Sequence, residues 1–147
     1  MKRIHLLCHD GGPEALASLF EAARREGLRV GWLDLAAAGA EAVPPALGQA
    51  LEGGAFRAAA VAPGRTVAAK ARSGPPVLRD LLREHFLGCA LVVVRPAGGG
   101  EGGPELDEAP RLEVEGSRFR VVPPAGAALE LSADDLAGRL RRPRPWG

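Results

Sequence analysis

The residues best suited to chemistry lie in one short stretch, LLCHDGGPEAL at residues 6–16. A thiol, an imidazole and a carboxylate follow one another at Cys8, His9 and Asp10, and two glycines come next. A cysteine acts as a nucleophile when an imidazole within hydrogen-bonding reach takes its proton. Adjacent residues of an extended strand point to opposite faces, so Cys8 and His9 could pair only at a turn. The pattern argues against a catalytic Cys8 and identifies no other catalytic residue.

The glycines Gly11 and Gly12 lead into a predicted helix that begins at Pro13. Free N–H groups and the helix dipole favour an anion at such a place, and glycine lets the backbone approach a phosphate or carboxylate closely. The same Gly-Gly-Pro sequence also opens many helices that bind nothing. The loop at Gly11 and Gly12 does not match GxGxxG, and GxxxxGK[ST] occurs nowhere in the chain, so we expect no nucleotide cofactor.

A second candidate anion site lies in GRTVAAKARSGPP, residues 64–76. Its basic side chains precede a predicted helix, and a Ser-Gly pair approaches that helix's N-terminus, where charge-assisted hydrogen bonds to an anion are strong. The alternative is solvated charge on the edge of an antiparallel pair, where lysine also prevents aggregation. Taken together, the predicted ligand-binding residues are Gly11, Gly12, Arg65, Lys70, Arg72, Ser73 and Gly74.

Three further polar residues have competing interpretations. His5, together with Cys8, His9 and Asp10, could contribute to a metal site, but no second cluster completes a coordination shell, so we expect no metal. Asp34 stands where dinucleotide-binding folds place a ribose-binding acid, without the glycine fingerprint that normally accompanies it. His85 lies on the apolar stripe of a helix and is predicted to be buried with one backbone hydrogen bond.

Four apolar segments are predicted to be buried strands: Arg3–Cys8, Leu28–Leu35, Phe56–Ala62 and Ala90–Arg95. The last, ALVVVR, is a continuous β-branched run typical of a strand covered on both faces. Helical patterns alternate with these strands at Pro13–Glu26, at Pro45–Glu52 and within residues 75–88, where the stripe consists of Val77, Leu78, Leu81, Leu82, His85 and Phe86. The alternation predicts a parallel sheet with crossover helices, and it resembles Rossmann-like three-layer α/β folds.

Two segments interrupt that regularity. Ala62–Arg65 has the residues of a type II turn, which would make Thr66–Ala71 an extra antiparallel strand; the alternative is a loop that approaches a ligand. Residues 96–110 hold five glycines and three prolines, and we expect no regular structure there. That segment would be either a flexible linker or a mobile lid over a site.

The sequence RLEVEGSRFRVV, residues 111–122, predicts an antiparallel hairpin. A two-residue type II′ turn at Gly116-Ser117 would place Glu113 opposite Arg120 on one face and Val114 opposite Phe119 on the other. Opposite charges then meet on one side and apolar groups on the other. Glu130 and Leu131 extend a further strand, and Ser132 is the predicted N-cap of a last short helix.

Parallel strands end at a common edge, where open α/β sheets bind ligands. The predicted topology gathers four segments at this edge: Cys8–Gly12, Leu35–Pro44, Ala62–Pro76 and Pro96–Pro110. This is therefore where we expect a small-molecule site.

Composition bounds the remaining possibilities. The 147 residues fit a single α/β domain over 1–147, and the net charge of +1 gives no general attraction for nucleic acid or anionic membranes. No apolar run could span a bilayer, and the two cysteines form no disulfide framework, so we expect a cytoplasmic protein. Abundant arginine, glycine and proline with no asparagine is thermophile-like, and it makes arginine clusters less informative.

The sequence thus leaves two functional hypotheses. In one, the protein binds a small anionic molecule, bearing phosphate or carboxylate, at the carboxyl edge of the sheet. In the other, it is a non-catalytic interaction or oligomerisation module that uses the hairpin or the Arg-rich tail at residues 139–147, for instance in a homodimer. That tail could also pack Trp146 on its own domain or on a neighbouring subunit, and the arginine bias favours such packing over contact with RNA or an acidic partner.

Overall fold

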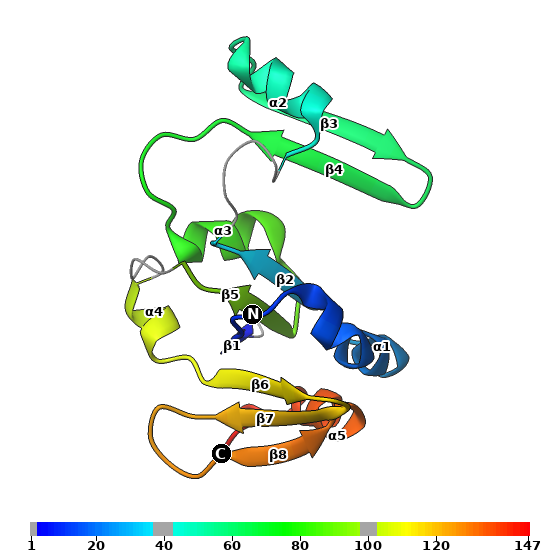
Figure 1. Cartoon of the computed structure of the whole chain (residues 1–147), viewed down its shortest axis with the longest axis vertical. Coiled ribbons are helices and arrows are strands. Elements are labelled where there is room, and N and C mark those ends of the chain that lie inside the picture. The colour runs from blue at the N-terminus through cyan, green and yellow to red at the C-terminus, as the bar shows by residue number, and fades with distance from the viewer. Residues whose placement is uncertain (1–2, 37–42, 98–102) are drawn as a thin grey trace. The chain divides into compact units, whose positions relative to one another are not determined.

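The computed structural model describes residues 3–36, 43–97 and 103–147. These residues form two compact units, Met1–Ala36 with Pro76–Gly147 (unit 1) and Ala37–Pro75 (unit 2), which Figure 1 colours along the chain. Each unit is described by itself below.

Unit 1 is built on a six-stranded, mostly parallel sheet with an antiparallel hairpin. The strand order is β2-β5-β1-β6-β7-β8. The first four of these run parallel to one another, and β7 and β8 continue the sheet antiparallel. The strands are β1 (His5–Cys8), β2 (Val30–Asp34), β5 (Leu91–Arg95), β6 (Arg111–Glu115), β7 (Arg118–Val122) and β8 (Leu129–Ser132). The mixed α/β class is confirmed, and three of the four predicted strands lie in this sheet; β5 is buried over its first four residues, whereas the edge strand β2 is only half-buried.

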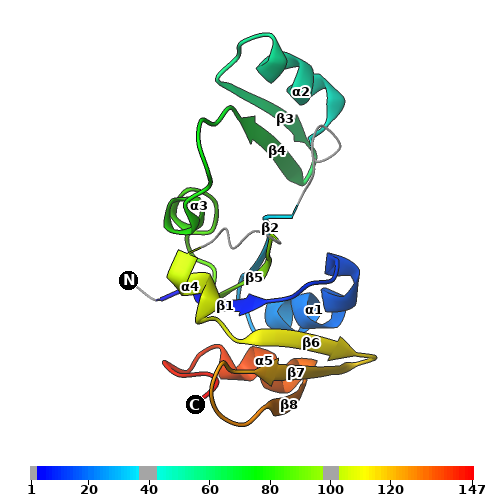
Figure 2. The same ribbon diagram turned by 60° about the vertical axis from the view of Figure 1, so that its left-hand side comes forward.

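Apolar side chains from helices pack on both faces of β5. Side chains of β5 alternate, so that Leu91 and Val93 join one apolar cluster while Val92 and Val94 join another. The first cluster includes side chains from η1 (Pro13–Leu16), α1 (Ala17–Arg25) and α5 (Ala133–Arg139), and the second includes side chains from α3 (Leu78–His85) and α4 (Gly103–Asp107). Figure 2 shows the two helix pairs on opposite sides of the sheet. These four side chains are fully buried, as the apolar run predicts, while Arg95 at the end of β5 is partly exposed.

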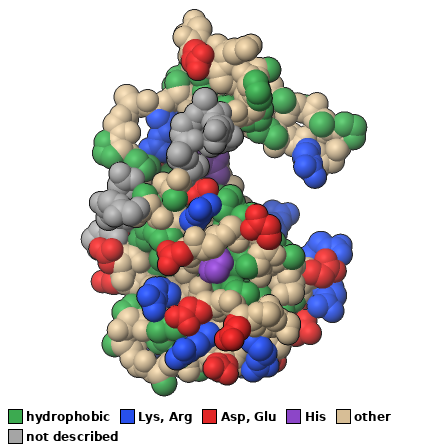
Figure 3. All heavy atoms as spheres, viewed as in Figure 1, with side chains coloured by type: hydrophobic (Ala, Val, Ile, Leu, Met, Phe, Trp, Pro, Cys, Tyr) green, Lys and Arg blue, Asp and Glu red, His purple; other side chains and the backbone are tan. Residues whose placement is uncertain are grey.

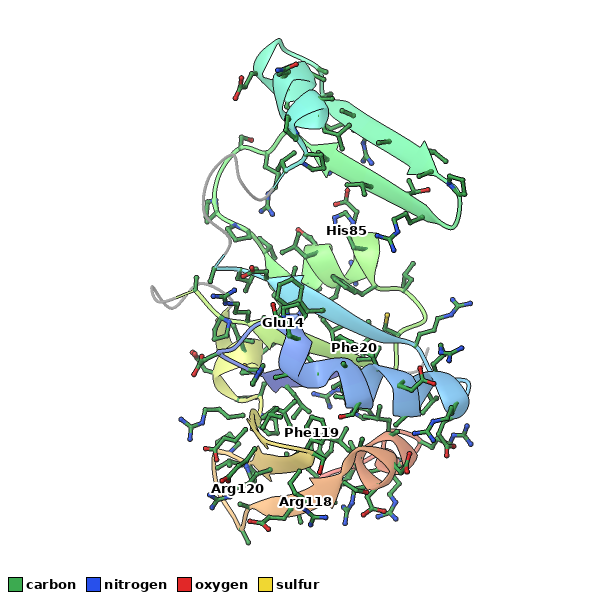
Figure 4. All side chains as sticks on the ribbon, turned by 45° about the vertical axis from the view of Figure 1, so that its right-hand side comes forward. Glu14, Phe20, His85, Arg118, Phe119 and Arg120 are labelled. Carbon is green, nitrogen blue, oxygen red and sulfur yellow. The ribbon has the colours of Figure 1, made fainter. Side chains whose placement is uncertain are left out.

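The predicted hairpin is confirmed in its register. Glu113 lies opposite Arg120 and Val114 opposite Phe119, with the turn at Gly116 and Ser117. Gly116 has φ +60° while Ser117 keeps a negative φ, which fits the type II′ turn and excludes type I′. Figure 4 shows the Phe119 ring pointing toward the helices while Arg118 and Arg120 point away from them. On the solvent face, acidic and basic side chains lie side by side over β6–β8 (Figure 3).

The C-terminal segment folds back on unit 1. The Ser132 hydroxyl accepts a hydrogen bond from the N–H of Asp135 at 3.1 Å, which confirms the predicted N-cap of α5. Trp146 packs against the first apolar cluster, and the Arg139 guanidinium donates to the Pro145 carbonyl at 2.9 Å. Arg141 bonds to the carbonyl of Glu26. The tail therefore packs on its own unit, which is one of the two packing alternatives left open by the sequence.

Unit 2 consists of α2 (Pro45–Glu52) packed on an antiparallel pair, β3 (Arg57–Ala62) and β4 (Arg65–Lys70). The helix and the extra antiparallel strand are as predicted. The prediction that Phe56–Ala62 is a buried strand of the main sheet is wrong: β3 pairs with β4 in a separate sheet, and Val61 is 80% exposed. The turn at Gly64, with φ +81°, brings β4 back beside β3 as its pairing partner. The alanine side chains of β3 also offer little apolar volume to bury between layers of helices.

Two other predictions are corrected. The His85 side chain is 49% exposed instead of buried. His85 is the last residue of α3, and the next residue, Phe86, is partly buried with its ring against Gly31 of β2. Regular structure does occur within residues 96–110, because α4 forms there and buries Leu106 against the sheet. Residues 98–102 of that segment lie outside the described residues.

Candidate ligand site at the carboxyl ends of β1 and β5

The connections that leave β1 and β5 go to opposite faces of the sheet. These two strands are neighbours, with Cys8 opposite Val94. The chain after β1 enters η1 and α1 on the face of the first apolar cluster, while the chain after β5 leads to α4 on the other face. Diverging connections from adjacent parallel strands leave a crevice outside their carboxyl ends, the usual ligand position in open α/β sheets.

His9 anchors the loop that follows β1. Its N–H donates to the Val94 carbonyl at 2.9 Å, which extends the strand pairing by one residue. Its ring Nδ1 lies 2.9 Å from the Leu112 carbonyl, so this nitrogen carries the proton, and the buried Nε2 has no partner in the described part of the chain. A Cβ added at Gly11 would lie 2.8 Å from Nε2. The His9 imidazole therefore supports the loop, and its position favours glycine at residue 11 because a Cβ there would lie too close to the ring.

Cys8 is unsuited to nucleophilic chemistry. The thiol is buried, and its Sγ lies 3.7 Å from the Leu106 carbonyl, to which it donates. Burial raises the pKa of Cys8 to about 11, and the carboxylates of Asp10 and Asp107 add to the increase. The reactive form of cysteine is the thiolate, which is scarce at neutral pH with such a pKa. Cys8 and Cys89 are both free, consistent with the expectation that the two cysteines form no disulfide framework.

Gly12 stands directly before the helical segment and carries no cap of its own. Its φ of −77° and ψ of 174° are ordinary extended values, and no side chain caps the start of η1. The carboxylate of Glu14 lies against Gly12, occupying the space that a Cβ would fill. Figure 4 shows Glu14 at the beginning of this helical segment. A carboxylate is favoured at the positive end of a helix, so the chain supplies its own anion where we predicted a ligand.

The ends of β2 and β5 add an ion pair to this edge. The Asp34 carboxylate accepts a hydrogen bond from the N–H of Ala36 at 2.8 Å, and its other oxygen lies 3.7 Å from Arg95 Nη1. Asp34 is 17% exposed and Arg95 40% exposed. Asp34 stands where a ribose-binding acid was considered, but its carboxylate is engaged in a turn and in an ion pair. Arg95 was not among the predicted ligand residues, although it ends the ALVVVR run that placed β5.

The second predicted group belongs to unit 2. Arg65 begins β4, and Lys70 ends it with Nζ 5.7 Å from the centre of the Phe56 ring. The expectation that this loop lies at the carboxyl edge depended on β3 joining the main sheet, and that basis is wrong. Ser73 and Gly74 do not cap α3 either, since Val77 holds the N-cap position without a side-chain hydrogen bond. Binding by this group, which also includes Arg72, stays a prediction.

Within the described ranges, no three His, Cys, Asp or Glu side chains gather in a way that could hold a metal ion. No helix in these ranges is both long and apolar enough to cross a membrane.

Comparison of the chain with protein-family models, with curated proteins and with solved structures gave no match. The geometry of the β1–β5 edge is therefore the basis for a functional proposal.

Proposed function

We propose that the protein binds a small molecule bearing a phosphate or carboxylate in the crevice outside β1 and β5. The observation that carries the proposal is the divergence of the connections from these adjacent strands to opposite faces. In this proposal the backbone N–H groups at Gly11 and Gly12 contact the anion, and Arg95 supplies the positive charge. The fold is then a three-layer, Rossmann-like domain over 1–147, with unit 2 as an insertion.

The proposal places the protein in the cytoplasm, where both free thiols would stay reduced.

An anionic ligand must compete with Glu14. The carboxylate of Glu14 already lies against Gly12, so the ligand has to displace it and is repelled by it until it does. Substitution of Glu14 by glutamine removes the charge and keeps the shape. We therefore expect Glu14→Gln to bind the same anion more tightly than the wild type does.

The test is a thermal-shift screen with nucleotides, phosphorylated sugars and dicarboxylates. Any ligand that stabilises the wild type is then tried on Gly12→Ala, in which the new Cβ blocks close approach of the anion. That Cβ meets only the far end of the flexible Glu14 side chain, and the backbone at Gly12 suits alanine, so the fold should tolerate it. Gly138→Ala is the matched control, because a Cβ there meets nothing within 4 Å.

Loss of the shift in Gly12→Ala, with retention in Gly138→Ala, supports the proposal. A wild type that responds to no anion, or a response that Gly12→Ala leaves intact, contradicts it. The double variant Lys70→Ala with Arg72→Ala asks whether unit 2 takes part: if the shift survives, unit 1 binds the anion alone.

The alternative function, an interaction module, finds less support in the two segments first considered for it. β7 of the hairpin is paired on both sides, with β6 and β8. The tail is held by Trp146 and by the hydrogen bonds of Arg139 and Arg141. An interaction surface is better sought in unit 2.

A further inference from the structure

One edge of β3 lies open among the described residues. The N–H of Ala71 donates to the Phe56 carbonyl at 3.0 Å, which makes these two a hydrogen-bonded pair of the antiparallel ladder. Such pairs alternate along the strands, so the even-numbered residues of β3 bond to β4. The N–H and C=O groups of Arg57, Ala59 and Val61 therefore point away from β4. No third strand pairs with β3 in the described part of the chain.

This edge lacks the features that usually prevent association. Exposed edges are commonly protected by charged side chains, proline or bulges. β4 carries a cation at each end, Arg65 and Lys70. β3 carries Arg57 at its start and then only alanine and valine through Ala62. Charge thus stands at both ends of β4, whereas β3 carries a charge only at its start.

We propose that β3 pairs with β3 of a second copy of this chain, antiparallel about a two-fold axis at Ala59. The axis places Ala59 opposite Ala59 of the partner subunit and Arg57 opposite Val61 of the partner subunit. The three outward-pointing residues of each β3 strand then lie opposite the three outward-pointing residues of the other copy's β3. Each outward N–H can therefore donate a hydrogen bond to a carbonyl of the other copy. No cation lies opposite another cation in this register.

The exposed apolar side chains of unit 2 support the same partner. Phe56 is 63% and Val61 80% exposed, and among the described residues of the unit only Leu47 is a buried hydrophobic side chain. A two-stranded sheet is marginal in water, whereas four strands with an apolar face are not. The paired sheet would run β4-β3-β3-β4 and extend the exposed alanine and valine side chains into one surface. Figure 3 shows few charged side chains on this hairpin compared with β6–β8.

The experiment measures molecular mass by analytical ultracentrifugation of the full chain from micromolar to millimolar concentration. We expect a monomer–dimer equilibrium in the wild type. Ala59→Pro removes an outward N–H that β4 does not use, so it should give a monomer at every concentration. Ala68→Pro is the matched control: Ala68 lies opposite Ala59 and its N–H faces the outer edge of β4, so this variant should dimerise as the wild type does.

Cross-linking gives a second readout that does not depend on how the proline variants fold. Opposite residues in a hydrogen-bonded antiparallel pair have Cα atoms about 5.5 Å apart, a separation that a disulfide spans. Ala59→Cys should therefore form a covalent dimer on mild oxidation, and Ala68→Cys should not. A wild type that stays monomeric at millimolar concentration overturns the proposal. So does a dimer that Ala59→Pro leaves unchanged, or equal cross-linking of the two cysteine variants.

Discussion

Cys8 should react slowly with alkylating reagents, although it lies beside His9 and Asp10 in the sequence. Its pKa of about 11 exceeds the ordinary value of 9.0 because the thiol is buried and faces the charges of Asp10 and Asp107. Each unit of pKa changes the thiolate fraction tenfold, so below pH 9 the folded protein holds about 100-fold less Cys8 thiolate than the unfolded chain. The rate of alkylation should fall by at least that factor.

The assay is site-resolved mass spectrometry after pulses of iodoacetamide, on native and urea-unfolded protein, across pH 7 to 11. In the native protein the Cys8 rate should keep rising about tenfold per pH unit up to about pH 11, while the unfolded chain levels off near its ordinary pKa. The chain has no tyrosine, so the ultraviolet absorbance of thiolate can be titrated independently without tyrosinate. Asp10→Asn should lower the pKa of Cys8, because it removes the larger of the two charge contributions.

The same shift has a consequence for stability. The folded state prefers the neutral thiol, so this contribution is fully present below the unfolded pKa and is lost as pH rises through about 11. Equal labelling rates for Cys8 in native and unfolded protein at neutral pH would refute the reasoning. That result would also restore thiol chemistry as a function for this loop.

Three stability measurements by urea denaturation follow from the fold. Phe119→Ala should lower the free energy of unfolding by about 3–5 kcal/mol, because the ring is fully buried in the first apolar cluster; a loss below about 1 kcal/mol would contradict that packing. Ser132→Ala should cost about 1 kcal/mol through loss of the helix cap, whereas the control Ser117→Ala in the turn should stay within about 0.5 kcal/mol. Gly116→Ala should lower the free energy of unfolding by about 1–2 kcal/mol, because the φ of this residue is +60°. Gly138→Ala lies within α5 and should raise the free energy of unfolding. Similar effects of the two substitutions would count against the type II′ turn.

The β6–β7 hairpin was predictable because its determinants are local. The turn at Gly116 sets the register, and one register alone pairs opposite charges on one face while it pairs Val114 with Phe119 on the other. A shift by one residue would exchange the two faces. Strand β5 was equally clear, since an uninterrupted β-branched run suits only a strand covered on both sides.

The assignment of Phe56–Ala62 failed because a run of alanines has no periodicity to show which face is buried. Its apolar character suggested a central strand, yet its small side chains suit a hairpin closed by a local turn. His85 failed for a different reason. Helical periodicity places it on the stripe, but α3 ends there and Phe86 fills the space beside Gly31.

The candidate site was predictable in its location and not in its charges. Alternation of strands and helices places Gly11 and Gly12 at the carboxyl edge, where the structure has them. Sequence alone does not reveal that Glu14 folds back on Gly12 or that Asp34 meets Arg95, because these contacts depend on the loop conformations and on strand order. The order β2-β5-β1 makes neighbours of strands that are distant in the chain.

The insertion of unit 2 between β2 and α3 makes the two proposals separable. Strand-to-helix connections in α/β folds are usually about 2–6 residues long, whereas here residues 35–77 join β2 to α3 and include α2, β3 and β4. Lengthening a connection costs a domain little, because the entropy of closing a loop grows only slowly with its length. Unit 1 therefore has its complete sheet without β3. Gly12→Ala should abolish anion binding and leave the dimer unchanged, while Ala59→Pro should abolish the dimer and leave the ligand-induced thermal shift unchanged. A thermal shift that disappears in Ala59→Pro would show instead that the ligand needs the dimer.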